Sequence, residues 1–265
     1  MSAGAIADAY DASATAWADG PDRVYGPLAD QMLRFAPVDI AGKIVLDLGA
    51  GTGTATRAAL AAGASMVIAV DLSAEMLRTG PPSPDVWPVV ADATALPFRT
   101  GAFDLVAAAC CLGHLADPIL GLSQAARVSS ALVATAFAAD WTHPAKSAVD
   151  EAMRGFGFVP PDWYVALKHD TEPLVADPTG FAALAVAAGW QHVEVTAIQV
   201  PTGLTAPADL VDWRCGMAHL APFVATLGPA RRAEARRAAE LALAGAAELV
   251  VPLLILTARN SRTAR

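Results

Sequence analysis

Short apolar runs alternate with helix-like segments between residues 43 and 137. Most of these runs end at glycine or aspartate, as is typical where a buried strand enters a loop. Strands that alternate with helices favour an α/β fold in which a doubly wound, mostly parallel sheet carries helices on both faces. We expect strands over Ile44–Leu48, Met66–Val70, Trp87–Val90, Phe103–Cys110 and Leu132–Phe137, separated by helices over Thr54–Ala62, Ser73–Leu77 and Pro118–Val128.

The segments before and after these five strands show a weaker pattern. Apolar residues recur at helical spacing on both sides of Gly20-Pro21, which predicts two helices that form a lid over the core from residues 1–40. Residues 141–188 carry two tryptophans and several prolines and predict a cap inserted after the fifth strand, ending in a helix over Phe181–Ala188.

Residues 189–265 are predicted to complete the core that begins at residues 41–140. Two further strands are expected over Gln191–Val200 and Leu249–Thr257, with a helical insertion over Ala206–Ala247 between them. The sheet would then have seven strands, and 265 residues is a suitable length for one large α/β domain.

The charge of the chain gives no electrostatic basis for nucleic-acid binding. The formal net charge is −8 and the sequence pI is about 5.0, whereas a nucleic-acid surface needs many cations to neutralise phosphates. The one basic cluster, at residues 231–237, is interleaved with glutamates and is interpreted as a solvated helix face.

Cysteine usage and hydropathy favour a cytoplasmic protein without a structural metal. The three cysteines, Cys110, Cys111 and Cys215, form no metal-binding spacing, and neighbours in sequence rarely pair in a disulfide. The start of the chain lacks the pattern of a signal peptide, and the apolar stretch Ala238–Ala258 is interrupted by charges and a proline, so we expect a helix and a strand there and no membrane span. The expected partner is a small molecule, with the protein a monomer or homodimer.

A glycine-rich loop follows the first predicted strand in the segment VLDLGAGTG, Val45–Gly53. A loop at the carboxyl end of a first parallel strand lies where doubly wound folds bind ligands, and glycine lets the backbone approach them closely. A dinucleotide fingerprint would need glycine at position 54, which is Thr54. The acid Asp47, two residues before the first glycine, suits the cationic amino-acid end of adenosylmethionine better than a pyrophosphate.

At this point the sequence resembles the class I S-adenosylmethionine-dependent methyltransferases, in particular the group related to ubiquinone and menaquinone C-methyltransferases. The resemblance runs in register over about Val45–Val128, and Ser129-Ser130 replaces a Lys-Pro-Gly-Gly turn that is usual in the family. It implies that Asp71 holds the cofactor ribose and Asp92 the adenine amino group, and that Tyr10 and Trp17 close over the cofactor. The full predicted cofactor set is Asp47, Gly49, Ala50, Gly51, Gly53, Asp71, Leu72, Met76, Asp92, Ala93, Cys110, Tyr10 and Trp17.

The acceptor site is predicted from residues that follow the fourth and fifth strands and from the helical insertion. His114 is a candidate general base or a pocket-lining residue, and His143 is a second catalytic candidate. For each aromatic residue or methionine among the candidates named below, the alternative is that the side chain only packs in the core. The candidate substrate-binding residues are Cys111, His114, Trp141, Trp163, Trp213, Met217 and His219, with no metal ligand among them.

These observations predict an enzyme that transfers the methyl group of adenosylmethionine by direct displacement to C, N or O of a small, mostly apolar or aromatic molecule. An irregular aromatic cap suggests natural-product biosynthesis. Three alternatives stay open at this point: an adenosylmethionine-binding cyclase or other non-methylating fold relative, a nicotinamide-dependent oxidoreductase, and a non-catalytic binding subunit.

Overall fold

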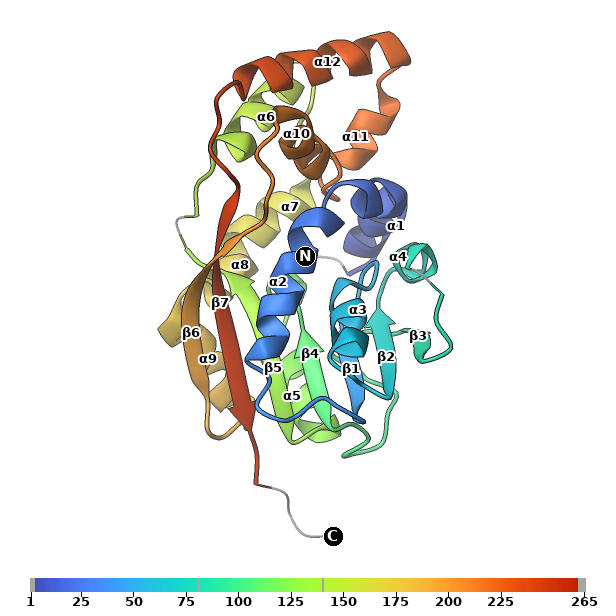
Figure 1. Cartoon of the computed structure of the whole chain (residues 1–265), viewed down its shortest axis with the longest axis vertical. Coiled ribbons are helices and arrows are strands. Elements are labelled where there is room, and N and C mark those ends of the chain that lie inside the picture. Colours follow the sequence, from blue (N-terminus) through green and yellow to red (C-terminus); the bar gives the residue numbers. More distant parts are fainter. Residues whose placement is uncertain (1–2, 81, 140, 262–265) are drawn as a thin grey trace.

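The computed structural model describes residues 3–80, 82–139 and 141–261, and the ends of the predicted lid and core segments at residues 1–2, 140 and 262–265 lie outside this range (Figure 1). Its strands form one seven-stranded sheet in the order β3-β2-β1-β4-β5-β7-β6. Only β7 runs antiparallel to its neighbours β5 and β6, so the predicted mostly parallel α/β sheet is confirmed. The strands are β1 (Ile44–Leu48), β2 (Met66–Asp71), β3 (Val86–Val90), β4 (Leu105–Ala108), β5 (Ala131–Phe137), β6 (Glu194–Pro201) and β7 (Val250–Arg259).

Successive residues of a strand point to opposite faces of the sheet. Both faces carry apolar side chains, and helices cover both of them. On one face, Val45 of β1 packs with buried residues of α2 (Asp22–Arg34) and α3 (Thr54–Ala61). On the other face, Leu46 packs with α5 (Pro118–Val128) and α9 (Pro178–Ala187). The strands of the sheet therefore read as nearly continuous apolar runs, as expected for a sheet buried on both faces.

A third layer of helices lies above the carboxyl ends of the parallel strands (Figure 1). Because ligands of doubly wound folds bind at these strand ends, this layer is in position to enclose them. It contains α1 (Ala3–Asp19), α6 (Pro144–Gly155), α7 (Asp162–Ala166), α10 (Pro207–Cys215), α11 (Ala221–Thr226) and α12 (Pro229–Ala242), while α4 (Ala74–Thr79), α8 (Glu172–Val175), the 3-10 turn η1 (Leu112–His114) and the π-helical turn η2 (Leu167–Thr171) complete the chain.

Short polar side chains fix the starts of several helices. Asp117 accepts a hydrogen bond from the Leu120 amide at the start of α5, and Asp177 accepts one from the Gly180 amide at the start of α9. In both cases proline occupies the first turn, where its missing N–H costs nothing. This Asp-Pro cap explains why α9 begins at Pro178, before the predicted start.

Local features explain where the fourth strand ends and why the third strand stays partly exposed. The fourth strand was expected to reach Cys110 but ends at Ala108, because Cys110 adopts a positive φ of 52° and its amide donates to the Thr135 hydroxyl at 3.0 Å. β3 is an edge strand, and Trp87 and Val90 on it remain 59% and 58% exposed.

The predicted cap, residues 141–188, folds into several helices rather than an irregular segment. Its last helix, α9, packs against α5 and the sheet core through Phe181 and Ala185. The part above the strand ends is therefore shorter than the predicted segment.

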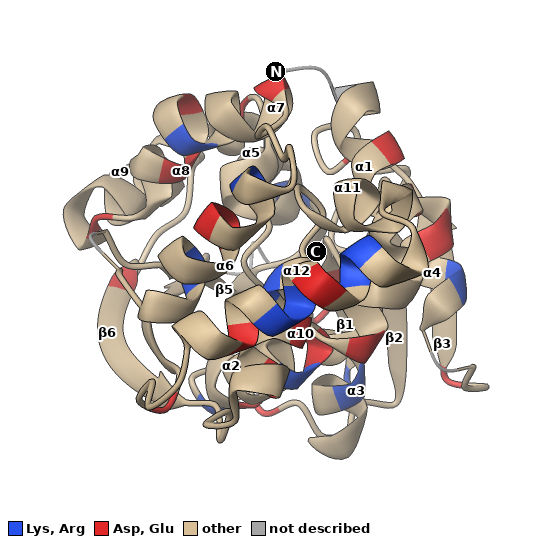
Figure 2. Cartoon of the chain, turned by 90° about the horizontal axis from the view of Figure 1, so that it is seen from above, with Lys and Arg blue, Asp and Glu red and all other residues tan. Residues whose placement is uncertain are grey.

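The basic cluster lies on α12, where Figure 2 shows basic and acidic bands interleaved. Its arginines are not simply solvated, since Arg236 pairs with Asp212 of α10 and with Glu240, and Arg232 donates to the Leu227 carbonyl at 3.1 Å. No helix within the described residues combines the length and apolar character needed to cross a bilayer.

Candidate active site

The loop after β1 is shaped by glycines at positions where a side chain would be strained. Gly49 has φ +72°, and a Cβ placed on it would lie 2.4 Å from the Cβ of Cys111 in the loop after β4. Gly51 has φ +55°, and nothing lies within 4 Å of a Cβ placed there. The loop backbone therefore packs tightly against its neighbour at one glycine and is open at the other.

Two carboxylates from adjacent strands lie under this loop. Asp47 is 1% exposed; its Oδ2 accepts from the Thr56 hydroxyl at 2.6 Å and its Oδ1 has no partner. Asp71 accepts from the Gly51 amide and the Ser73 amide, both at 2.8 Å. Burial raises the pKa of Asp47 to about 6, and burial also raises the pKa of Asp71 against the opposing effect of its backbone hydrogen bonds.

A cavity of about 300 Å³ opens above these carboxylates, and we call it the cofactor cavity. Gly53, although predicted to be part of this site, is not in its lining; it adopts a left-handed conformation with φ 84° at the start of α3. The predicted residues that do line the cofactor cavity are Tyr10, Trp17, Asp47, Gly49, Ala50, Gly51, Asp71, Leu72, Met76, Asp92, Ala93, Cys110, Cys111 and His114.

Helix α1 forms one wall of the cofactor cavity and is held there by a polar contact. Asp11 accepts hydrogen bonds from the Ser73 hydroxyl at 2.5 Å and from the Glu75 amide at 3.0 Å, at the start of α4. On the same helix, Trp17 packs with buried Met76 of α4. These contacts join the N-terminal helix to the loop that carries Asp71.

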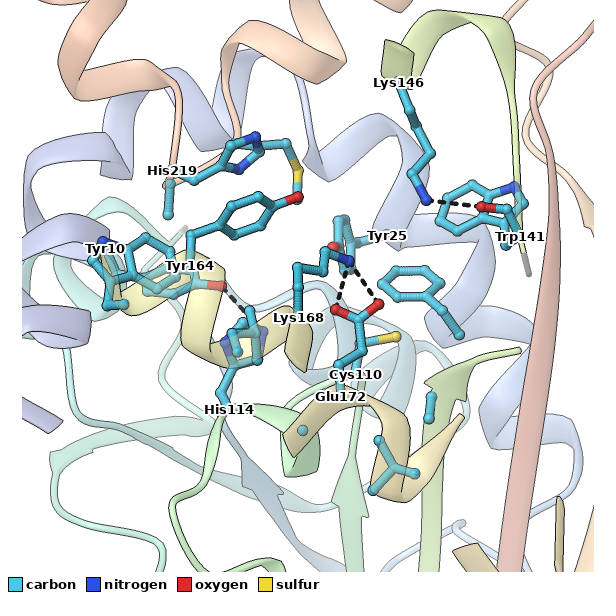
Figure 3. Close-up of a pocket in the computed structure, with 18 of the residues that line it drawn as sticks. Tyr10, Tyr25, Cys110, His114, Trp141, Lys146, Tyr164, Lys168, Glu172 and His219 are labelled. Atoms are coloured by element: carbon cyan, nitrogen blue, oxygen red, sulfur yellow. Dashed lines mark hydrogen bonds and ion pairs between the residues drawn. The ribbon is translucent and has the colours of Figure 1, made fainter. Parts of the chain in front are cut away.

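A second, smaller cavity of about 70 Å³ adjoins the first, and we call it the acceptor cavity (Figure 3). Four side chains line both cavities: Tyr10, Tyr25, Cys110 and His114. The structure also brings to the acceptor cavity five of the predicted substrate residues, namely Trp141, Trp163, Trp213, Met217 and His219.

His114 lies at the junction of the two cavities in η1. Its Nε2 is 3.3 Å from the Tyr10 hydroxyl, and its buried Nδ1 has no hydrogen-bond partner. Desolvation lowers the pKa of His114 to about 4, so the imidazole is neutral near pH 7. Desolvation also raises the pKa of Tyr10, which keeps the phenol protonated. A neutral imidazole can accept a proton, as a general base must.

The two neighbouring thiols are not suited to nucleophilic chemistry. Burial raises the pKa of Cys110 to about 12 and raises the pKa of Cys111 as well, so both stay protonated near neutral pH. Cys111 lines the cofactor cavity beneath Gly49 and is not in the lining of the acceptor cavity, where it was predicted.

His143, the second catalytic candidate, is in the lining of neither cavity. Its Nδ1 accepts from the Ala145 amide at 3.1 Å and caps α6, and its Nε2 lies 3.3 Å from the Ala247 carbonyl oxygen. The prediction is corrected on this point, because both ring nitrogens of His143 are used in holding α6.

The upper wall of the acceptor cavity contains charged side chains that the sequence analysis missed, and a stacked ring pair that includes the predicted residue His219. Tyr164 stacks on His219 with ring centroids 4.0 Å apart, and Arg214 forms a two-pronged bond to Asp150 at 2.8 and 2.7 Å. Burial lowers the pKa of His219 to about 2. Other lining residues missed by the sequence analysis are Tyr25, Phe137, Lys146, Lys168 and Glu172.

Lys168 belongs to a local structure that is recognisable only once the fold is known. The π-helical turn η2 carries Lys168, and such turns are frequent at functional sites. The sequence contains no motif that announces a π-helical turn, so spacing alone could not place Lys168 beside the cavity.

Comparison with known proteins identifies the family of the chain. Residues 46–131 match the methyltransferase domain family. The chain is 33% identical over 198 residues to a demethylmenaquinone methyltransferase of Mycolicibacterium vanbaalenii, with 71% of this chain and 84% of that protein covered. The chain belongs to the class I adenosylmethionine-dependent methyltransferases. Within them it is of the quinone methyltransferase type, and the nicotinamide alternative is set aside.

Solved structures of low sequence identity share the fold of this methyltransferase. A protein of Anabaena variabilis described as a methyltransferase from an antibiotic biosynthesis pathway superposes with a TM-score of 0.62 at 15% identity, covering 87% of this chain and 96% of that chain. A phosphoethanolamine N-methyltransferase of Haemonchus contortus in complex with S-adenosylhomocysteine gives a TM-score of 0.53 at 18% identity, covering 88% of this chain and 52% of that chain.

The cofactor of this methyltransferase is adenosylmethionine, and the residues at the cofactor cavity fit it. The unpartnered Oδ1 of buried Asp47 calls for a donor or a cation, which a ligand with an ammonium and a sulfonium group supplies. The open space at Gly51 leaves the loop backbone accessible to a ligand. In the described part of the chain, no group of three or more His, Cys, Asp or Glu is placed to hold a metal ion.

Proposed function

We propose that this methyltransferase methylates an aromatic or enolisable carbon of a small, mostly apolar molecule in natural-product metabolism. Methylation of a nitrogen or an oxygen on the same kind of scaffold is the alternative, and the test below distinguishes it from methylation of carbon. The observation that carries the proposal is the aromatic acceptor cavity, which meets the cofactor cavity at Tyr10, Cys110 and His114. The name of the relative from M. vanbaalenii, a demethylmenaquinone methyltransferase, supports an aromatic ring as acceptor.

The cofactor would be held by residues at the ends of three strands and by residues of helix α1. Asp71 would accept hydrogen bonds from the ribose hydroxyls through the free lone pairs of its two oxygens, and Asp47 would face the cationic amino-acid end. Asp92, whose Oδ1 already accepts from Thr94, would contact the adenine amino group with its other oxygen. Tyr10 and Trp17 would close the cavity from α1.

Adenosylmethionine supplies an activated methyl group on a positively charged sulfur. The task of the protein is therefore to orient the acceptor and exclude water, and such positioning can lower a barrier by roughly 7–11 kcal/mol. The aromatic side chains Trp141, Trp163 and Trp213 would hold a planar scaffold by packing against it.

His114 would act as the general base when the acceptor must lose a proton. Its neutral imidazole lies at the junction of the cavities, within reach of an acceptor atom that faces the cofactor. The Tyr10 hydroxyl, 3.3 Å from Nε2, would orient the ring and select its tautomer.

The experiment is an activity screen with donor labelled in its methyl group by deuterium. The acceptors are 1,4-naphthoquinol, 1-naphthol and 1-naphthylamine, which offer carbon, oxygen and nitrogen in similar scaffolds. We expect a product heavier by one labelled methyl group, with NMR locating that group on carbon. Methylation only on oxygen or nitrogen would overturn the carbon assignment.

Two further outcomes separate the remaining alternatives. Adenosylhomocysteine binding without methylation of any acceptor in a broad aromatic panel would contradict methyl transfer to aromatic molecules. An adenosyl-dependent product of unchanged mass would instead indicate a cyclase-like fold relative.

A further inference from the structure

Three cationic side chains line the acceptor cavity, and two of them are neutralised by carboxylates. Lys168 Nζ lies 2.5 Å from Glu172 Oε2, and Arg214 pairs with Asp150 through two hydrogen bonds. Because the partners are adjacent and partly or fully desolvated, these two pairs contribute little net charge to the cavity. The third cation differs from them.

Lys146 has no carboxylate partner among the described residues. Its Nζ donates to the Trp141 carbonyl at 3.0 Å and lies 4.3 Å from the centroid of the Trp141 ring (Figure 3). The ammonium group has three hydrogen-bond donors, and the carbonyl and the ring face provide partners for some of them. Neither partner carries a negative charge, so the positive charge of Lys146 is not neutralised.

The position of Lys146 in the fold makes its positive charge still less favourable. Lys146 lies in the first turn of α6, where the helix dipole favours negative rather than positive charge. Burial, together with the nearby charges of Lys168 and Arg214, lowers the pKa of Lys146 to about 8, and Glu172 and Asp150 oppose this shift. An anion beside Lys146 would offset both penalties.

The same cavity has hydrogen-bond donors without acceptors. Trp213 is 3% exposed and lines the cavity, yet its Nε1 has no partner, and the Nε1 of Trp141 is likewise buried without one. An indole N–H can only donate. The Nε2 of His219, in a side chain that is 4% exposed, is also unpartnered. A ligand with a hydrogen-bond acceptor beside the Trp213 indole would therefore supply a partner that this N–H lacks.

We propose that the acceptor carries an anionic oxygen group, a carboxylate, on its aromatic scaffold and that Lys146 is the specificity-determining residue that binds it. The inference rests on the proposed function, since it takes this cavity as the acceptor site. The Trp213 indole N–H supplies a second donor to the same end of the molecule.

The geometry also gives the acceptor a direction. Lys146 enters the cavity from α6, and His114 lies on the opposite side of the residues drawn in Figure 3. The carboxylate at Lys146 therefore points the far end of the scaffold toward His114 and the cofactor cavity. An aromatic acid would be held at one end and methylated at the other.

The test compares matched acid and amide probes. The protein is saturated with adenosylhomocysteine and titrated by calorimetry with 2-naphthoate and with its neutral isostere 2-naphthamide, and with benzoate and benzamide as smaller probes. A charge-assisted hydrogen bond contributes about 10- to 100-fold in affinity. We expect the wild-type protein to prefer the acids by about that factor.

Three variants assign the preference to one side chain. Lys146→Met keeps the aliphatic length and should remove the preference, whereas Lys146→Arg keeps the charge and should retain most of it. Lys43→Met removes a lysine charge next to the amino end of β1, remote from the acceptor cavity, and should leave the preference unchanged.

Equal binding of acid and amide by the wild type, failure of every acid to bind, or a preference that survives in Lys146→Met would each overturn the assignment. The proposed function can fail separately. If the acid preference holds and depends on Lys146 but no aromatic acceptor is methylated, the anion site stands and the methyl-transfer proposal falls.

Discussion

The two adjoining cavities are built in different ways. The cofactor cavity is formed mainly by loops that directly follow β1, β2, β3 and β4, and its floor carries the carboxylates of Asp47 and Asp71. The acceptor cavity draws its walls from α1, α2, η1, β5, α6, α7, η2, α8 and α10, and it is aromatic and basic. The cofactor cavity is acidic and comes mostly from one stretch of sequence, with α1 added, whereas the acceptor cavity is assembled from distant segments.

The family segment and the proposed acceptor site occupy mostly different parts of the chain. The segment that matches the methyltransferase domain family, residues 46–131, contains most of the cofactor cavity and ends before the tryptophans and charges of the acceptor cavity. The donor site can therefore stay constant while changes in the cap alter the acceptor.

The largest expected effect follows from replacing His114, one of the four residues that line both cavities. Replacing His114 by alanine removes the proposed base, and loss of general base catalysis lowers turnover by about 100- to 10,000-fold. Adenosylhomocysteine affinity should change little, which a calorimetric titration would show. His169→Ala, at an exposed position of η2, is the matched control. Wild-type turnover in His114→Ala would remove this histidine from the mechanism.

A smaller effect is expected on cofactor binding when a carboxylate of the cofactor cavity is removed. Asp71→Ala removes two acceptor oxygens that are proposed to bind the ribose, at a cost of about 1.5–3 kcal/mol for charge-assisted hydrogen bonds. Adenosylhomocysteine should bind about 10- to 150-fold more weakly. Asp85→Ala, an exposed carboxylate before β3, should bind normally. Unchanged affinity in Asp71→Ala would show that the ribose does not lie there.

The two cavities should also respond differently to pH. The raised pKa of Asp47, about 6, means that its carboxylate becomes protonated as pH falls through 6 and loses its attraction for a cationic ligand. Cofactor affinity should therefore be full above pH 6 and decline below it. Turnover at saturating cofactor should not decline from protonation of His114 until pH approaches 4. A titration series between pH 5 and 8 checks both.

The variant Asp47→Asn should change cofactor affinity and the free energy of unfolding in opposite directions. Its cofactor affinity should be weaker and independent of pH between 5 and 8. Above pH 6 the buried carboxylate destabilises the fold without ligand, because its folded pKa exceeds its ordinary value. The free energy of unfolding at pH 8 should rise by about 1–3 kcal/mol in the variant, as measured by urea denaturation. A less stable variant would contradict the view that this buried carboxylate, with one oxygen unpartnered, destabilises the fold.

The smallest expected effect concerns the hydroxyl that joins the cavities. Tyr10→Phe removes the group 3.3 Å from His114 Nε2 while keeping the ring that packs near Trp17. Loss of one hydrogen bond of about 0.5–1.5 kcal/mol should lower turnover about 2- to 12-fold. An effect as large as that of His114→Ala would make Tyr10, rather than His114, the proton-transfer residue.

The comparison also explains what could be predicted from sequence. The strands, the glycine loop and Asp71 could be predicted because each strand is a short apolar run. The glycine or aspartate that ends such a run marks the edge of the sheet where ligands bind. Trp141, Trp213 and His219 were identified by residue type, with packing as the alternative. Lys146 and Glu172 were missed because their contacts, to the Trp141 carbonyl and to Lys168, are local in sequence and do not show that both side chains face a cavity whose walls come from distant segments.

His143 shows the opposite error. Its position after the fifth strand suggested chemistry, but a histidine followed by proline can also cap a helix, and this one does. Residue type and position along the chain could not separate the two roles, since only the ring contacts distinguish them.

The most direct test of the division between the cavities is one calorimetric titration of adenosylhomocysteine into wild type, Asp71→Ala and Lys146→Met. The account predicts a single site per chain, similar affinity in wild type and Lys146→Met, and affinity about 10- to 150-fold weaker in Asp71→Ala. Equal weakening by Lys146→Met and Asp71→Ala, or no binding to the wild type, would contradict it.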